Sequence, residues 1–324
     1  MIAAARPFMK KFFCLILITL IGLAWRSSGA AELQAITVAL VSPSWNTGLP
    51  TAVARGAGFF KEEGLDVRPV TLSSSGPIMM ALLMSGQADF VIAGAVAILR
   101  GIARGAPVLV VGGHLSRMSY ALMADKKLKK VADLKGKTIG VTGIGGMGEF
   151  TVVESLRREG LLKDRDFFML NIEGGPAARI AALKTGKVQA VPLTPGQRVQ
   201  AENDGFTMLL DTRETLTEIP STIVASTREF AAASPDKTAR LLRALQRAME
   251  LIRRDKEKAI ALGMRHGLRG DLAIERKALD YYAADLDIRV KTENIAALLK
   301  QIDISDPPQK YFDEIYLTRA LARQ

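Results

Sequence analysis

The chain has 324 residues, of which 48% are hydrophobic and 24% charged, with 28 glycines and 13 prolines. This balance excludes a disordered chain, a coiled coil, a collagen and a disulfide-rich miniprotein, and the length allows one large domain or two of about 100–200 residues. The formal net charge of +11 favours an anionic partner, which is a nucleic acid, an anionic surface or an anionic ligand.

The first thirty residues are typical of a secretory signal peptide. A basic stretch (6–11) precedes an unbroken apolar run over 12–24 and the small residues of 27–31. The run is shorter than the about 20 apolar residues of a membrane span, so an uncleaved anchor is the less favoured alternative. We expect cleavage after Ala30 and an exported, periplasmic protein, which makes nucleic acid the least favoured anionic partner.

Removal of residues 1–30 changes the composition that matters for chemistry. Cys14 is the only cysteine, so the mature chain holds no disulfide, no thiolate nucleophile and no cysteine metal site. The segment also contains four basic residues and no acidic ones, so the net charge falls from +11 to +7. We expect no resident metal and no other cofactor.

The mature chain alternates strand and helix patterns. Strands are predicted where β-branched and apolar residues run together, over 36–41, 66–72, 88–93 and 107–112. Helices are predicted between them, over 51–63, 76–84 and 95–104. A second series opens with a strand over 138–142 and a helix over 146–158. Alternation at this pace predicts βαβ units and mostly parallel sheets.

Short matches between the two series recur in the same order. Glu63-Gly64-Leu65 returns as Glu159-Gly160-Leu161, Gly76-Pro77 as Gly175-Pro176, and Ala81-Leu82 as Ala182-Leu183. Proline in a first helical turn loses little, because its missing N–H has no helical partner there. The ordered set predicts two similar α/β lobes.

From Ser234 onward the chain is predicted to be helical. Leucine, methionine and isoleucine fall on one face of the first helix, at Leu241, Leu242, Leu245, Met249 and Ile252. Arginines line the other side, at Arg240, Arg243, Arg247 and Arg254. We interpret them as a solvated outer face, because export disfavours a DNA-reading helix. Tyr281-Tyr282 and Tyr311-Phe312 are interpreted as packing aromatics.

Ligands of open parallel sheets bind beyond the carboxyl ends of the strands, where helix N-termini converge. In the first lobe, the residues predicted to bind the ligand at these positions are Ser42, Trp45, Asn46, Ser73, Ser74, Ser75, Gly76, Ala93, Gly94, Ala95 and His114. The second lobe offers Gly145, Gly146, Met147, Gly148, Glu149, Thr194 and Arg198. Two facing sets of helix N-termini favour an anionic or strongly polar small ligand.

Several of these side chains have two interpretations. The Trp45 ring could close over a ligand or plug the gap between loop and core. Glu149 could meet a ligand amine or stabilise its own helix, and Arg198 and Arg179 could pair with an anion or lie on helix faces. His114 is either a site residue or, more often for such a position, a satisfied loop histidine.

The run Gly143–Gly148 matches G-x-G-x-x-G between a strand and a helix, which is the dinucleotide-binding context. Export argues against a nucleotide cofactor, so we interpret the loop as one half of a ligand cleft. Catalytic constellations are missing from the sequence, which has two histidines, no H-E-x-x-H and no G-x-S-x-G.

Four segments resemble the substrate-binding proteins of ABC importers for sulfonates, taurine, nitrate and thiamine pyrimidine precursors. They are Gly58-Phe59-Phe60-Lys61-Glu62-Glu63-Gly64-Leu65-Asp66-Val67, Ser85-Gly86-Gln87-Ala88-Asp89-Phe90, Asp133-Leu134-Lys135-Gly136-Lys137-Thr138-Ile139-Gly140-Val141 and Ala182-Leu183-Lys184-Thr185-Gly186-Lys187-Val188. The resemblance extends over about 36–230 and is specific for the superfamily rather than for a ligand.

The resemblance implies a two-lobed type II periplasmic-binding-protein fold, whose lobes close on a ligand. It implies lobe 1 over 31–124 and 217–324, lobe 2 over 125–216, and hinge strands over 120–125 and 222–227. Relatives often have Ser or Thr where Met147 and Gly148 stand, so an anion here would rely more on backbone N–H groups. The cysteine-rich motif of the yeast-type pyrimidine synthases is absent.

We therefore expect a periplasmic solute-binding protein, not an enzyme. It would act as a monomer, capture a small anionic or heteroaromatic ligand and deliver it to an ABC permease in the inner membrane. The alternatives are a ligand-sensing module with another partner and an exported enzyme on the same fold.

Overall fold

The computed structural model describes residues 32–42, 44–71, 76–217 and 219–322, except the side chain of Pro176. The predicted signal peptide and the serines Ser73, Ser74 and Ser75 lie outside the described residues. Chain contacts divide the protein into 1–33 and Gln34–Gln324, and everything below concerns the second unit. Within the described ranges, no helix is long and apolar enough to cross a membrane.

This unit contains two five-stranded sheets, as the repeated pattern predicts. Sheet A has the order β2 (Leu65–Thr71), β1 (Gln34–Leu40), β3 (Phe90–Gly94), β10 (Thr222–Thr227) and β4 (Val108–Leu115). Sheet B has the order β7 (Phe167–Asn171), β6 (Lys137–Val141), β8 (Ala190–Leu193), β5 (Ala121–Ala124) and β9 (Thr207–Asp211). One strand in each sheet, β10 or β5, runs antiparallel to both neighbours, so the sheets are mostly parallel.

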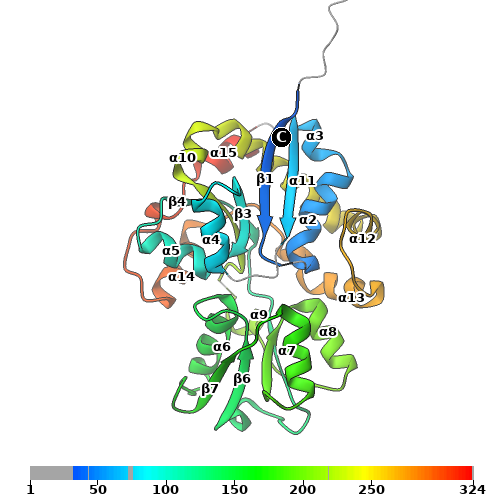
Figure 1. Ribbon diagram of the computed structural model, residues 1–324, viewed down its shortest axis with the longest axis vertical. Helices are drawn as coiled ribbons and strands as arrows, with labels where there is room; N and C mark the ends of the chain where they lie inside the picture. Colours follow the sequence, from blue (N-terminus) through cyan, green and yellow to red (C-terminus); the bar gives the residue numbers. More distant parts are fainter. Residues whose placement is uncertain (1–31, 43, 72–75, 218, 323–324) are drawn as a thin grey trace, which may run out of the picture. The chain divides into compact units, whose positions relative to one another are not determined.

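We call each sheet with its helices a lobe (Figure 1). Lobe A carries α2 (Trp45–Gly56), α3 (Phe59–Glu62), α4 (Gly76–Met84), α5 (Ala95–Ala103), α10 (Arg228–Ala233), α11 (Pro235–Arg254), α12 (Lys256–Arg265), α13 (Leu272–Tyr282), α14 (Thr292–Gln301) and α15 (Ile315–Leu321). Lobe B carries α6 (Met147–Arg158), α7 (Gly175–Lys184), α8 (Pro195–Asn203) and α9 (Thr212–Thr215). Short 3₁₀ turns lie at Val131–Leu134, Ala283–Asp285 and Pro308–Lys310.

The strands found in the two segments predicted as hinges, β5 and β10, each pair within one sheet. β5 pairs with β8 and β9 in sheet B, and β10 pairs with β3 and β4 in sheet A. The chain therefore passes between the sheets just before each strand, over 116–120 and 212–221. Sheet pairing puts β5 with lobe B, whereas the boundary expected at residue 124 puts it with the first lobe; the division into domains stays a proposal.

The first predicted helix begins earlier than residue 51. Ser44 is its extended N-cap and α2 starts at Trp45, with Pro50 inside the helix. Pro50 is the sixth residue of α2, where its missing N–H costs the helix one backbone hydrogen bond. Trp45 and Asn46 are thus helical residues and not loop residues.

The apolar face predicted for the long helix is confirmed. The five apolar residues of this face are fully buried in the core of lobe A. They are Leu241, Leu242, Leu245, Met249 and Ile252 of α11. The prediction of a solvated arginine face is wrong for Arg243, which is buried and donates to Glu63 at 2.9 and 3.0 Å. Tyr282, Tyr311 and Phe312 are core residues, as expected.

Candidate functional site

A cavity of about 110 Å³ lies where the carboxyl ends of parallel strands from both sheets meet helix N-termini. Lobe A and its adjoining crossing contribute Val41, Ser42, Ser44, Asn46, Thr47, Gly76, Gly94, Ala97, Ser221 and Thr222. Lobe B contributes Thr142, Gly146, Met147, Gly148, Gly175, Arg179, Thr194 and Gln197, and Tyr120 comes from the first crossing. This is the position that the parallel-sheet rule predicts for a ligand.

Six helices present their N-cap or first turn to this cavity. They are α2, α4, α5, α6, α7 and α8, through residues such as Asn46, Gly94, Gly148 and Thr194. The first N–H groups of a helix have no helical partner and carry partial positive charge, which favours an anion. The backbone alone therefore makes the cavity electropositive.

Arg179 is the one charged side chain in the cavity wall among the described residues. It is 7% exposed, and its Nη1 and Nη2 donate to Thr142 Oγ1 at 2.6 Å and Gln197 Oε1 at 3.2 Å. Both acceptors are neutral, and its buried Nε has no partner in the described part of the chain. Burial lowers the pKa of Arg179, with only the Tyr120 hydroxyl opposing that shift. An arginine remains protonated nonetheless, so the cavity holds an uncompensated cation.

Eight of the residues predicted from the sequence line this cavity. They are Ser42, Asn46, Gly76, Gly94, Gly146, Met147, Gly148 and Thr194. Their contact with a ligand stays a prediction. Sequence reasoning left Arg179 undecided and did not single out Tyr120, Thr142, Gln197 or Ser221, because only the folded chain brings them to one place.

Ala93 and Ala95 are fully buried and do not line the cavity, although Gly94 between them does. The reason is that β3 ends and α5 begins here, so neighbouring side chains point into the core.

Gly145 lies in the loop before α6 and Glu149 lies in the first turn of α6, and neither residue lines the cavity. The Glu149 carboxylate accepts from Gly145 N at 2.5 Å and from Lys163 Nζ at 2.6 Å. Although burial acts to raise it, these two hydrogen bonds hold the pKa of Glu149 below its ordinary value. Arg100 of α5 donates to the Gly145 carbonyl at 3.2 Å, so this loop joins lobe B to lobe A. The helix-stabilising interpretation of Glu149 fits these contacts.

His114 is fully buried behind the cavity wall. Its Nδ1 lies 3.0 Å from Oγ1 of Thr222, and Thr222 is the residue that reaches the cavity. Burial lowers the pKa of His114 to about 4, so the ring is neutral near neutral pH. His114 therefore contacts a hydroxyl of the cavity wall and does not itself line the cavity.

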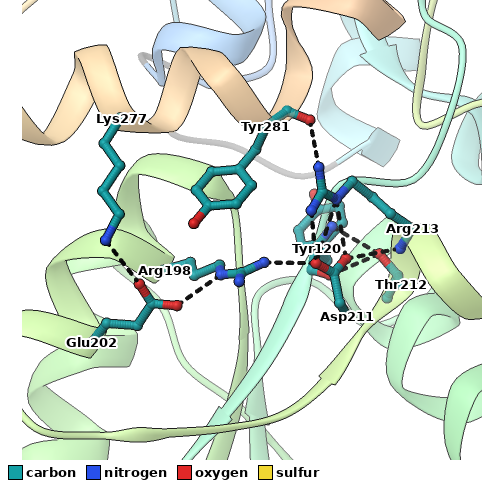
Figure 2. Close-up of polar contacts among 8 residues, drawn as sticks. All are labelled: Tyr120, Arg198, Glu202, Asp211, Thr212, Arg213, Lys277 and Tyr281. Carbon is teal, nitrogen blue, oxygen red and sulfur yellow. Dashed lines mark hydrogen bonds and ion pairs between the residues drawn. The ribbon is translucent and has the colours of Figure 1, made fainter.

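Arg198 does not line the cavity. It donates to Glu202 Oε1 at 2.9 Å and to Asp211 Oδ2 at 2.6 Å, and it lies over the ring of Tyr281 (Figure 2). Two carboxylates thus compensate its charge, which is the opposite of the surroundings of Arg179.

Trp45 is 3% exposed and lines a second hollow of about 180 Å³. Its indole N–H donates to the Arg269 carbonyl at 2.9 Å. The second hollow shares Ser44, Asn46, Thr194 and Gln197 with the cavity, so the two adjoin. The structure therefore places Trp45 beside the cleft rather than over the cavity.

Glu275 of α13 also lines the second hollow, and its carboxylate makes no hydrogen bond or ion pair with the described residues. Burial and the neighbouring Asp271 raise the pKa of Glu275 to about 7. The folded chain therefore binds the carboxyl proton of Glu275 more tightly than the unfolded chain does. Protonated Glu275 thus stabilises the fold fully below about pH 4.5, and this stabilisation is lost as the pH rises through about 7.

Glu275→Gln should remove that pH-dependent loss. We expect the variant to melt a few degrees above the unchanged protein near pH 8.5 and at the same temperature near pH 5. Thermal unfolding followed by circular dichroism at both pH values measures this difference. Equal melting temperatures near pH 8.5 would contradict it, and Glu293→Gln, on the exposed start of α14, is the control.

A family model described as NMT1/THI5 like matches residues 46–259. A protein of Brucella abortus (strain 2308), which has a provisional name as a binding protein, is 26% identical over 155 residues. That match covers 48% of this chain and 46% of the Brucella protein, so the chain spans about half the length of the curated relatives that it matches.

Solved structures cover nearly all of the described chain. A protein of Bordetella bronchiseptica RB50 has a TM-score of 0.78 at 25% identity, over 90% of this chain and 98% of that one. The alkanesulfonate-binding protein SsuA of Xanthomonas axonopodis pv. citri, bound to MOPS, has a TM-score of 0.72 at 22% identity over 90% and 98%. The periplasmic nitrate-binding protein NrtA of Synechocystis PCC 6803 has a TM-score of 0.74 at 16% identity over 90% and 89%.

These likenesses confirm the predicted two-lobed periplasmic-binding-protein fold. The family model covers more than half of the chain, from residue 46 to residue 259. The chain belongs to the NMT1/THI5-like family.

Proposed function

We propose that this chain is a periplasmic solute-binding protein that captures a small organic anion between its lobes. The observation that carries the proposal is the buried Arg179 guanidinium, which has no carboxylate partner among the described residues. A buried cation costs free energy unless an anion compensates it, and in this cavity the compensating charge is left for a ligand. No acidic side chain lies among the described residues of the wall, and six helix N-termini surround it.

The relatives support the same chemistry. Two proteins of similar fold are named for binding an alkanesulfonate and nitrate, and both of those ligands are anions. The wall here is also lined by small and neutral polar residues, so the ligand would be held by N–H groups, hydroxyls and one guanidinium. By the same likeness, the protein would hand its ligand to an ABC permease without changing it chemically; that it acts as a monomer is a further part of the proposal.

Calorimetric titration of the mature chain, stripped of bound ligand by unfolding and refolding, tests this function. The panel holds nitrate, short alkanesulfonates, carboxylates, a neutral pyrimidine and an alkylammonium salt as the cationic control. We expect saturable 1:1 binding of at least one anion class with micromolar affinity, about −8 kcal/mol, and recovery of the ligand unchanged. Binding confined to neutral or cationic compounds, or conversion of a ligand, would overturn the proposal.

Export is the other half of the proposal. The basic and apolar residues of 6–24 support cleavage after Ala30 and a periplasmic location. N-terminal sequencing of the protein from a periplasmic fraction would then begin at Ala31, and an intact membrane-bound chain would restore the anchor alternative.

A further inference from the structure

A charged and aromatic cluster outside the cavity joins the two lobes. The guanidinium carbons of Arg198 (α8) and Arg213 (α9) lie 4.5 and 4.9 Å from the centre of the Tyr281 ring (α13). Arg213 Nη1 also donates to the Tyr281 carbonyl at 3.0 Å. Figure 2 shows Tyr281 reaching down from α13 toward both arginines. We call these three residues with Asp211 the interlobe clamp.

One carboxylate holds the two arginines of the clamp in place. Asp211, at the end of β9, is 6% exposed and accepts from Arg198 Nη1 at 2.6 Å and Arg213 Nη2 at 3.1 Å. It also accepts from the Arg213 backbone N at 2.9 Å. Although burial acts to raise it, the bonds from Arg213 and Arg198 hold the pKa of Asp211 below its ordinary value. The guanidinium groups of Arg198 and Arg213 are thus held by a carboxylate of their own lobe as well as by the Tyr281 ring.

The ring is fixed in lobe A. Tyr281 lies on α13, whose Ala278, Leu279 and Tyr282 are buried in the core around sheet A. A more exposed pair, Lys277 with Glu202 at 3.6 Å, runs beside the clamp. Breaking contact between α13 and α8 would expose the ring and both arginines together, so the clamp is broken whenever the lobes move apart here.

The clamp also adjoins both chain crossings. Thr212 follows Asp211, and its hydroxyl makes two hydrogen bonds to the backbone of Tyr120. It donates to the Tyr120 carbonyl at 2.8 Å and accepts from the Tyr120 N–H at 2.9 Å. Tyr120 lies on the first crossing and lines the cavity, whereas Thr212 opens the second crossing. The clamp is therefore continuous with the segments that must bend if the lobes open.

We propose that the interlobe clamp stabilises the lobes-together state and thereby sets ligand affinity without touching the ligand. Affinity is weaker when only a small fraction of the protein is in the state that binds ligand, because the apparent Kd equals the intrinsic Kd divided by that fraction. A cation over an aromatic ring is attracted to it, and more strongly where water is excluded. Only the affinity part rests on the proposed function, since the lobe positions can be measured without ligand.

A matched pair of variants at Tyr281 tests the clamp. Tyr281→Phe keeps the ring and its attraction for the arginines, whereas Tyr281→Leu keeps apolar packing and loses that attraction. The mature chain has no cysteine, so Met84→Cys on α4 and Phe168→Cys on β7, both exposed positions, take spin labels cleanly. Electron–electron distance measurements then compare the lobes in the ligand-free protein.

We expect Tyr281→Phe to match the unchanged protein and Tyr281→Leu to show a longer, broader distance distribution. For an anion that binds the unchanged protein, we expect Tyr281→Leu to weaken affinity about tenfold and Tyr281→Phe less than about twofold. Equal distance distributions for the two variants would overturn the clamp, whatever the ligand panel gives. Melting temperatures are measured alongside, so that a variant that fails to fold is replaced by Arg198→Gln.

Discussion

Arg179→Met should abolish anion binding and, at the same time, raise the melting temperature of the ligand-free protein. A desolvated guanidinium that meets an anion contributes enough that its loss should weaken binding at least about 100-fold, which corresponds to about 2.7 kcal/mol. Stability should move the other way, because burial disfavours the charged form of Arg179 and no carboxylate offsets that cost.

The neighbours of Arg179 make the stability gain possible. Thr142 Oγ1 keeps a hydrogen bond to the Ile172 carbonyl, and Gln197 Oε1 keeps one from Thr194 N. Removing the arginine therefore leaves neither of these two oxygen atoms without a hydrogen bond. Methionine is also unbranched and fills much of the space that the arginine stem occupied.

Arg243→Met is the matched control for this prediction. The two arginines are almost equally buried, at 7% and 8% exposed, but Arg243 is paired with Glu63 and lies outside the cavity. Its loss leaves the Glu63 carboxylate without that partner, so we expect a destabilisation on the order of 3 kcal/mol and unchanged anion affinity. Titration calorimetry and thermal unfolding of both variants measure the contrast; anion affinity that survives Arg179→Met would remove Arg179 from the site.

The comparison between Arg179 and Arg198 shows where sequence reasoning stops. Each arginine comes three residues after a proline in the first turn of its helix, Pro176 or Pro195, so the local pattern is the same. The difference is made by Asp211, which is supplied by β9 and takes Arg198 out of the cavity. A single sequence carries no signal for that long-range partner.

Other parts of the site follow from local rules and were predictable. The carboxyl ends of parallel strands meet helix N-termini at one edge of a sheet, which is why Ser42, Gly94 and Thr194 were predicted where the cavity lies. Trp45 was less predictable because it depends on where α2 begins. Once residue 45 is helical, the next residue points about 100° away, so Asn46 faces the cavity and Trp45 packs near Gly263 and Gly270.

Gly148→Leu should fill the cavity and exclude the ligand while the protein still folds. Gly148 stands in the first turn of α6 and lines the cavity, and a Cβ there would have Pro192 Cγ at 3.9 Å and the Thr142 carbonyl oxygen at 4.0 Å as its nearest atoms. There is thus ordinary contact at the Cβ and a cavity of about 110 Å³ beyond it. We expect affinity for a bound anion to fall at least about 30-fold, about 2 kcal/mol.

Gly148→Ala is the partner variant at the same position. Alanine adds only the Cβ and favours helical backbone over glycine by at most about 1 kcal/mol, so this variant should bind normally and unfold at the same or a slightly higher temperature. Gly76→Ala should behave differently, because its Cβ would lie 2.1 Å from the Ala97 Cβ and would force the chain apart. Leucine at 148 that left anion affinity unchanged, with alanine as the reference, would show that the ligand does not occupy this cavity; a loss of affinity with leucine alone places the ligand against the start of α6.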